Sequence, residues 1–176
     1  KYYFHTNFPI LPRLRKIMRH FIFFKTQKKE NEYKKDTKPL PWWRAIIYPI
    51  YYGFNYFLGH FWTWMQKTSG GSIIIFDRYF YEYFINPQFI KCPRWLLFLI
   101  EKFIVKPDLL IFLKTSPEII YERKKELPIH EIERQLKECE KICIRYKNGF
   151  IIDASKPPEK ILEEIQRKII NKLKIK

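Results

Sequence analysis

Residues 72–83, SIIIFDRYFYEY, contain the pattern that decides the fold. Three isoleucines and a phenylalanine form an unbroken apolar run, which ends abruptly at Asp77 and Arg78. A strand that is apolar throughout has to be covered on both faces, as parallel strands between layers of helices are. The run therefore predicts a buried strand with a charged pair at its carboxyl end. Taken alone, that pair is equally well explained as a helix N-cap or a surface pair.

The rest of the chain repeats the alternation of apolar strands and helices. Strands are predicted at 2–5 (YYFH), 109–113 (LLIFL) and 150–152 (FII), and helices at 79–84, 93–104, 117–127, 128–147 and 155–174, the last with Ser155 as its N-cap. Apolar strands that alternate with helices predict a parallel sheet in an α/β sandwich. The fold class expected from the residues is therefore α/β.

In open parallel sheets, ligands bind beyond the carboxyl ends of the strands. Three predicted strands end in polar residues: Asp77 and Arg78, then 114–116 (KTS), then 153–155 (DAS). The charged pair of the opening stretch is thus expected on the edge of the sheet where a ligand would bind.

The charge of the chain is strongly basic. The 176 residues include 34 Lys and Arg against 18 Asp and Glu, a formal net charge of +16. Such a balance predicts affinity for polyanions, whether nucleic acid, phosphorylated ligands or an anionic membrane surface, and does not choose among them. A solvated basic loop is expected at 25–38, where no apolar period occurs. The cysteines, three in number and without metal-ligand spacing, predict a reduced, cytoplasmic protein.

The stretch 41–65, PWWRAIIYPIYYGFNYFLGHFWTWM, has about the length of a membrane span. It contains Arg44, Pro49, Asn55 and His60, and no second span accompanies it. We therefore expect no transmembrane span here, but a long helix buried by a sheet.

Two groups of charged residues have the chemistry of a phosphate site. Asp77, at a strand end, could hold Mg²⁺, and Arg78 could bind a phosphate through two parallel hydrogen bonds. The basic segment 122–126 (ERKKE), together with Arg134, could close over a polyphosphate, or could form a solvated helix face with Glu–Lys pairs.

Four segments in order resemble a known family. They are GGSIIIFDRYFYEYFINP (70–87), PDLLIFLKTSPEIIYERKKELP (107–128), EIERQ (131–135) and IIDASKPPEKILEEI (151–165). Together they look like the C-terminal part of the thymidylate kinase-like branch of the P-loop nucleotide kinases. The resemblance implies a parallel-sheet α/β/α sandwich, and transfer of the γ-phosphoryl group of ATP, with Mg²⁺, to a dTMP-like nucleotide or a related small acceptor. It also suggests a homodimer through the aromatic helix 42–65.

The resemblance implies a role for individual residues on the acceptor side. Asp77 would lie near the Mg²⁺ ion and the acceptor phosphate, and Arg78 would grip that phosphate. Tyr79 would help to wall the site. Asn55 and His60 are weaker candidates for contacts with the acceptor.

On the donor side, the resemblance implies a lid and a loop. Arg123, Lys124 and Arg134 would belong to the lid over the donor phosphates. Ala154, Ser155 and Lys156 would lie in the loop that borders the donor adenine.

The chain departs from the family in one large respect. The phosphate-binding loop needs a glycine followed by Lys, and none of the five glycines here is followed by Lys. In the family's strand order 2-3-1-4-5, the central strand that feeds this loop would be missing as well. The chain, which begins with Lys, is therefore expected to be a single, N-terminally incomplete domain, 1–176, that is inactive alone.

Two alternatives of other classes stay open at this point. A non-catalytic basic module of the same fold could hold nucleic acid or a protein partner. A peripheral membrane protein could use residues 42–65 and the lysine-rich loop.

Overall fold

The computed structural model describes residues 2–4, 11, 38–67 and 73–174 of the chain. These residues belong to two compact units, Lys1–Val105 and Lys106–Lys176. Among the described residues, each unit contains one pair of parallel strands. The basic loop expected at 25–38 lies outside the described residues except for Lys38.

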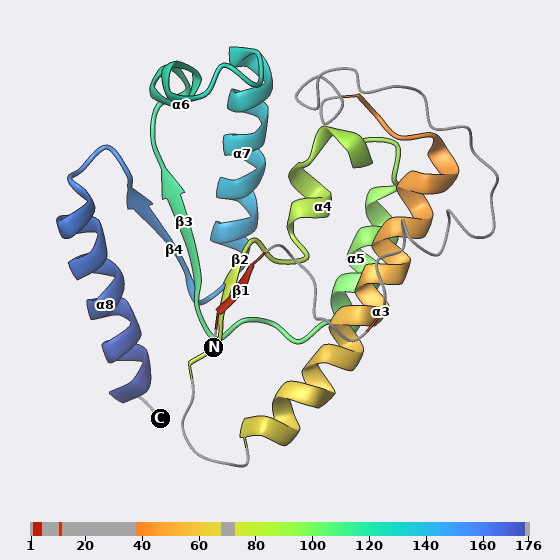
Figure 1. Cartoon of the computed structure of the whole chain (residues 1–176), viewed down its shortest axis with the longest axis horizontal. Helices are drawn as coiled ribbons and strands as arrows, with labels where there is room; N and C mark the ends of the chain where they lie inside the picture. The colour runs from red at the N-terminus through yellow and green to blue at the C-terminus, as the bar shows by residue number, and fades with distance from the viewer. Residues whose placement is uncertain (1, 5–10, 12–37, 68–72, 175–176) are drawn as a thin grey trace. The chain divides into compact units, whose positions relative to one another are not determined.

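The first unit combines a short parallel strand pair with helices rich in aromatic residues (Figure 1). Its elements are β1 (Tyr2–Phe4), α3 (Trp42–Lys67), β2 (Ile75–Asp77), α4 (Glu82–Ile85), the 3₁₀ helix η1 (Pro87–Phe89) and α5 (Arg94–Phe103). In the pair, Tyr2 lies opposite Ile75 and Phe4 opposite Asp77. The parallel pairing of 2–5 with the strand that ends at Asp77 agrees with the predicted topology.

The core of the first unit is a cluster of aromatic rings. Tyr56 and Phe80 are almost fully buried and meet edge to face, with ring centroids 6.2 Å apart. Leu97 of α5 is buried as well. Gly53 lets α3 approach α5 closely, because a Cβ atom at this position would collide with the side chain of Ile100. Rings of this size bury much apolar surface for few residues, which suits a unit with so small a sheet.

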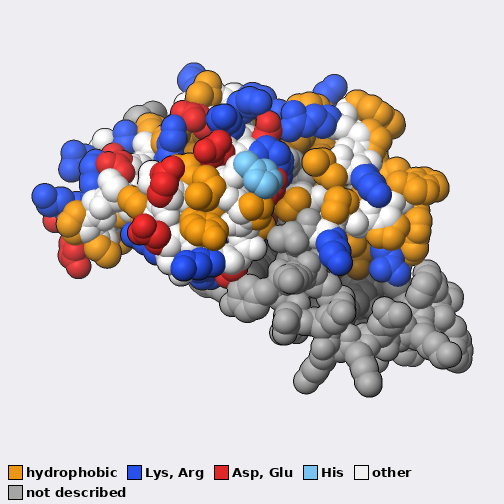
Figure 2. Space-filling view, turned by 90° about the horizontal axis from the view of Figure 1, so that it is seen from above, with side chains coloured by type: hydrophobic (Ala, Val, Ile, Leu, Met, Phe, Trp, Pro, Cys, Tyr) orange, Lys and Arg blue, Asp and Glu red, His pale blue; other side chains and the backbone are white. Residues whose placement is uncertain are grey.

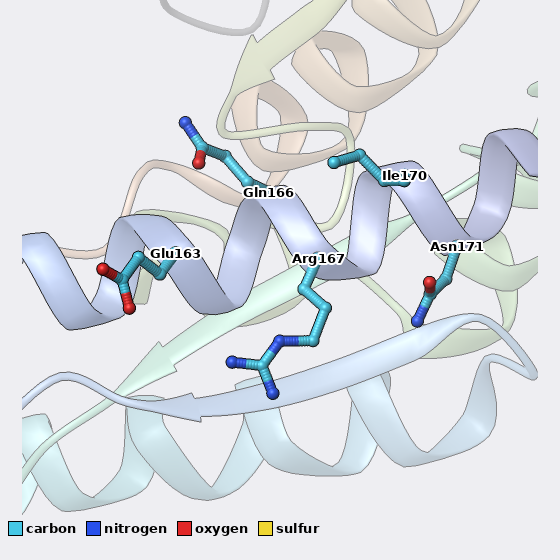
Figure 3. A pocket seen from close by; sticks show the side chains of 5 residues that line it. All are labelled: Glu163, Gln166, Arg167, Ile170 and Asn171. Carbon is cyan, nitrogen blue, oxygen red and sulfur yellow. The ribbon is translucent and has the colours of Figure 1, made fainter.

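The second unit contains a two-stranded parallel pair with a helix on each side. Its elements are β3 (Leu110–Lys114), α6 (Pro117–Arg123), α7 (Ile129–Arg145), β4 (Gly149–Asp153) and α8 (Pro158–Lys174). The strands pair in register from Leu110 opposite Gly149 to Lys114 opposite Asp153. The pair lies between α7 and α8 (Figures 1 and 3). This arrangement is of the α/β type expected from the sequence.

Several boundaries differ from the sequence prediction; helix α6, for example, ends at Arg123 and not at residue 127. Strand β2 begins at Ile75, since residues 73–74 are not in a strand, and it extends to Asp77. The helix expected at 79–84 begins only at Glu82, because Arg78 adopts a positive φ of 65° and the chain turns before it coils. The helix expected from Ser155 begins at Pro158, because the Ser155 amide and hydroxyl both donate to the Asp153 carboxylate.

The expectation that the aromatic helix is buried by a sheet is wrong. Helix α3 packs against α5 and η1, and Pro49 lies inside it. A stripe of large apolar side chains along α3 is exposed to between 42% and 63%: Ile47, Ile50, Phe54, Phe57 and Phe61. The spacing of three and four residues places all five on one face of the helix. We call this face the α3 stripe.

Helix α3 does not have the composition of a membrane span. Among the described residues, no helix is both long enough and apolar enough to span a membrane. This finding agrees with the expectation for 41–65, whose polar residues interrupt the apolar run.

The strands expected to be covered on both faces are only partly covered. Ile75 of β2 is 51% exposed, Leu113 of β3 is 47% exposed and Ile151 of β4 is 38% exposed. In contrast, Ile152 is buried on the other face of β4. The described part of the chain thus leaves apolar strand surface in contact with solvent.

Candidate functional site

The charged pair lies at the carboxyl end of β2, as predicted. Asp77 is the last residue of the strand, and Arg78 follows it with an exposed side chain. The Arg78 guanidinium donates to the Glu82 carboxylate over 3.1 Å, which is an i,i+4 ion pair. Glu82 also accepts a hydrogen bond of 3.3 Å from the side-chain amide of Asn86. Arg78 is thereby oriented at the strand end while its side chain stays open to solvent.

Tyr79 and His60, two residues predicted on the acceptor side, lie next to each other. The Tyr79 hydroxyl lies 3.3 Å from His60 Nε2, and it donates to the Val105 carbonyl over 2.6 Å. The His60 Nδ1 atom donates to the Tyr56 carbonyl over 2.8 Å, one turn earlier in α3. The polar atoms of both side chains are therefore engaged inside the first unit.

Asn55, the other candidate on α3, lies inside the core. It is 2% exposed, and its side-chain oxygen accepts a hydrogen bond of 3.4 Å from the Leu11 amide. Its neighbour Tyr56 is also buried, and this burial raises the pKa of its hydroxyl well above the ordinary value. Asn55 thus binds the backbone of Leu11.

The carboxyl ends of β3 and β4 lie at one edge of the second unit. The Ala154 amide donates to the Lys114 carbonyl over 2.7 Å, which joins the two strand-end loops. Ser155 folds back on Asp153 through its amide and hydroxyl, and the hydroxyl is the main cause of the lowered pKa of that carboxyl. Lys156 lies 3.4 Å from Glu164 of α8. The predicted loop 154–156 is therefore a tight turn at a strand edge.

The candidate lid residues occupy helices α6 and α7, which pack together. Arg123 is exposed in the last turn of α6, and Lys124 ends that helix 3.6 Å from Glu126. Arg134 donates from Nε and Nη2 to the two oxygens of Glu131, over 2.8 and 2.7 Å. The bonds from Arg134 are the first cause of a lowered pKa for Glu131, and they raise the pKa of Arg134 in turn.

Three partner groups were not predicted from the sequence. They are Glu82, Glu131 and the Val105 carbonyl. The pairing of Glu131 with Arg134 was visible in principle, because a spacing of three residues brings charges together on a helix. The pairing of Arg78 with Glu82 was not, because Arg78 lies in the turn before α4. The third is a backbone atom 26 residues from Tyr79, and a sequence carries no signal for such a contact.

One hollow on the surface carries no candidate residue. It is lined by Glu163, Gln166, Arg167, Ile170 and Asn171, all of which come from α8 (Figure 3). Because one exposed helix face supplies every side chain, the hollow is a surface depression and not a binding site.

On the face seen in Figure 2, the lysine and arginine side chains of the described residues are not gathered into one patch. Lysine and arginine side chains are distributed over the described part of this face, with acidic and apolar side chains between them. A nucleic-acid surface is normally a clustered basic face or stripe. The distribution lends no support to the nucleic-acid alternative.

Comparisons with known proteins point to one family. The family model described as Thymidylate kinase matches residues 59–165, which include Asp77, Arg78 and the whole lid segment. A "Probable thymidylate kinase 1" of Saccharolobus solfataricus is 26% identical over 108 residues. The match covers 58% of this chain and 57% of that relative, so the chain spans little more than half of the relative's length. No solved structure gives a significant match.

Proposed function

Because this chain belongs to the thymidylate kinase family, we propose that it takes part in transfer of the γ-phosphoryl group of ATP to a dTMP-like nucleotide or a related small acceptor. The observation that carries the proposal is the position of Asp77 and Arg78. Asp77 is the last residue of a parallel strand and Arg78 follows it, and the Arg78 side chain is exposed and directed by Glu82. An arginine so placed can bind a phosphate through two parallel hydrogen bonds.

The proposed reaction requires these residues to bind and neutralise phosphates. Phosphoryl transfer depends on positioning and on neutralisation of charge, with little covalent chemistry by the protein. Arg78 would hold the acceptor phosphate in line, and Arg123, Lys124 and Arg134 would neutralise the donor phosphates. For Arg134 to do so, the phosphates must share it with Glu131 or displace that carboxylate.

Mg²⁺ fits the acceptor-side residues through Asp77. In such sites the ion keeps several waters and is held by one or two carboxylates together with the substrate phosphates. The described residues contain no group of three or more His, Cys, Asp and Glu that could form a closed metal site. We therefore assign Asp77 as the protein ligand, and the bound ion would offset the charge on the transferred phosphate.

The donor phosphates need a loop that these 176 residues do not contain. No glycine here is followed by Lys, whereas a phosphate-binding loop ends in Gly-Lys-Ser or Gly-Lys-Thr. We propose that sequence outside this chain supplies that loop and a strand that covers the exposed apolar strand surface. The 176 residues alone would then be inactive.

An assay with radiolabelled ATP tests the function. The chain would be expressed alone and joined to its upstream coding sequence, and each product would be incubated with Mg²⁺, labelled ATP and dTMP. We expect labelled dTDP from the longer product only. Robust turnover by the 176 residues alone would contradict the need for an external loop, and no transfer by the longer product to any nucleoside monophosphate would contradict the kinase proposal.

The α3 stripe supports the homodimer as a further part of the proposal. Its spacing of three and four residues is that of a helix-packing seam, and exposed apolar surface of this kind commonly marks an interface. Phe54→Lys and Phe57→Lys place charges in the centre of the stripe. We expect both variants to sediment as monomers where the wild type sediments as a dimer, and a monomeric wild type would overturn the assignment.

A further inference from the structure

The backbone of Arg78 has a conformation that is unfavourable for residues other than glycine. Among the described residues other than glycine, Arg78 alone has a positive φ, 65°. The left-handed region is sterically unfavourable for a residue with a Cβ atom. Such a conformation persists where the surrounding structure holds it. The question is which contacts hold it here.

The next residue, Tyr79, is fixed by a hydrogen bond and by ring contacts. It is 8% exposed, and its hydroxyl donates a short bond of 2.6 Å to the Val105 carbonyl. Its ring meets Tyr56 of α3 at a centroid distance of 4.8 Å and Phe76 of β2 at 5.4 Å. The side chain that follows Arg78 is therefore tied to α3, to β2 and to the segment that follows α5.

The contact at the hydroxyl joins segments that are distant in the sequence. His60 lies 19 residues before Tyr79, and Val105 lies 26 residues after it. The Tyr79 carbonyl accepts from the Glu82 amide over 3.0 Å, at the turn that starts α4. Glu82 in turn binds the Arg78 guanidinium. One tyrosine thus fixes both the backbone of Arg78 and the turn that carries its carboxylate partner.

We propose that Tyr79 is a positioning residue: the bond from its hydroxyl to the Val105 carbonyl holds Arg78 in the left-handed conformation from which its guanidinium receives the acceptor phosphate. The proposal rests on the proposed function in so far as Arg78 is the phosphate ligand. It changes the expected role of Tyr79, because the hydroxyl faces a backbone carbonyl and the ring faces the core. Tyr79 acts on the acceptor through Arg78.

The test uses Tyr79→Phe, which removes the hydroxyl and keeps the ring. Tyr83→Phe is the matched control, because Tyr83 is equally buried and packs on Phe80 and Phe89, with no hydrogen bond of its hydroxyl among the described residues. The KM for dTMP and the kcat are measured for both variants in the chain joined to its upstream coding sequence. Hydrogen exchange of the Glu82 amide is measured by NMR on the same samples.

For Tyr79→Phe we expect a KM raised about tenfold with kcat within about twofold, because a neutral hydrogen bond that positions a binding group affects affinity first. We also expect exchange of the Glu82 amide to be about tenfold faster. Tyr83→Phe should change neither quantity by more than about twofold. A KM for Tyr79→Phe that stays within twofold of wild type overturns the positioning role.

Failure of the proposed function gives a different result. If wild-type protein transfers no phosphate, the kinase proposal fails. The exchange rate of the Glu82 amide alone then decides whether Tyr79 anchors the turn after Arg78. Faster exchange of the Glu82 amide in Tyr79→Phe, and not in Tyr83→Phe, supports the anchor in that case. An unchanged exchange rate overturns it.

Discussion

Tyr79 in the first unit, and Arg134 and Ser155 in the second, are held by different kinds of contact. In the first unit, Tyr79 is bound to groups 19 and 26 residues away in the sequence. In the second unit, Arg134 is bound to Glu131 three residues before it, and Ser155 to Asp153 two residues before it. Tyr79 is thus held by tertiary contacts, and Arg134 and Ser155 by local pairing within one helix or one turn. The division is not complete, because Arg78 pairs locally with Glu82 and the Ala154 amide donates to the distant Lys114 carbonyl.

The difference fits the phosphoryl transfer that we propose. An acceptor has to be held in line to within a fraction of an ångström, which demands a rigid site. A lid has to open and close around the donor in each cycle, and lids are built from elements with few tertiary contacts. We therefore expect substitution of Tyr79 to lower the affinity for the acceptor, and substitutions at Arg134 and Ser155 to have smaller effects.

The largest effect is expected for Arg78→Ala. Loss of a charged, two-pronged phosphate contact costs about 3 to 4 kcal/mol, so kcat/KM for the acceptor should fall about 10²- to 10³-fold. Steady-state kinetics with varied dTMP measures it. Arg167→Ala, at an exposed arginine of α8, is the control and should leave kcat/KM within twofold. A loss of less than fivefold for Arg78→Ala would remove this residue from the site.

Gly149→Ala is expected to be the most damaging of two matched glycine substitutions. A Cβ atom at Gly149 would collide with the carbonyl oxygen and carbon of Cys143, which are backbone atoms at the end of α7. Because the backbone cannot turn aside as a side chain can, we expect a loss of about 3 kcal/mol in the free energy of unfolding. Urea unfolding measures this loss, and a change below about 1 kcal/mol would contradict the close approach.

Gly53→Ala should cost less, about 1 to 2 kcal/mol. Its Cβ atom would meet the Ile100 side chain, which can shift where a backbone cannot. The substitution Ile100→Ala removes the obstacle and should cost less in the Gly53→Ala background than in wild type. Additive costs in this double-mutant cycle would show that α3 and α5 do not meet at these residues.

Glu131→Gln has the smallest expected effect, and it depends on pH. The hydrogen bonds from Arg134 lower the pKa of the folded Glu131 carboxyl below its ordinary value near 4.5. The stabilisation is therefore complete above that value and is lost as the pH falls through the lowered pKa. We expect Glu131→Gln to reduce stability by about 0.5 to 1 kcal/mol at pH 7.

The pH series of urea unfolding checks the sign. The difference between wild type and Glu131→Gln should shrink toward zero below the folded pKa of Glu131. Glu133→Gln, on the exposed side of α7, is the control and should differ little from wild type at pH 7. A difference that grows on acidification would contradict the pairing of Glu131 with Arg134.

The sequence predicted the strands and their parallel pairing well, for a physical reason. Unbroken apolar runs such as 109–113 leave few alternatives to a covered strand, and Asp77 and Asp153 mark where each run ends. Pro117 and Ser116 likewise mark the start of α6, where the Ser116 hydroxyl accepts from the Ile119 amide. Local patterns of this kind are readable because their causes lie within a few residues.

The late start of α4 has causes that lie further away, whereas the late start of α8 follows from the bonds of Ser155 to Asp153 two residues before it. Nothing in the letters 78–82 shows that Arg78 takes a positive φ, because the contacts with Val105 and His60 that accompany it come from other segments. The exposed stripe on α3 was missed for a related reason. An apolar helix looks the same in sequence whether a sheet or solvent lies against it.

The charged residues of the candidate site could be predicted from the sequence, and most of the contacts that hold them could not. Asp77 and Arg78 were recognisable at a strand end, and Arg134 was recognisable as a basic residue of the lid segment. The partner of Arg134, Glu131, required knowledge of which spacing lies on a helix, and the partner of Arg78, Glu82, required the turn that precedes α4. The anchoring of Tyr79 required the three-dimensional structure.

The most direct test of the central claim follows the labelled phosphate of ATP to dTMP in the full-length protein, for wild type and Arg78→Ala side by side. We predict labelled dTDP that depends on Mg²⁺ in wild type and falls about 100-fold or more in Arg78→Ala at limiting dTMP. Undiminished transfer by Arg78→Ala would contradict the assignment of the β2 strand end as the acceptor-phosphate site.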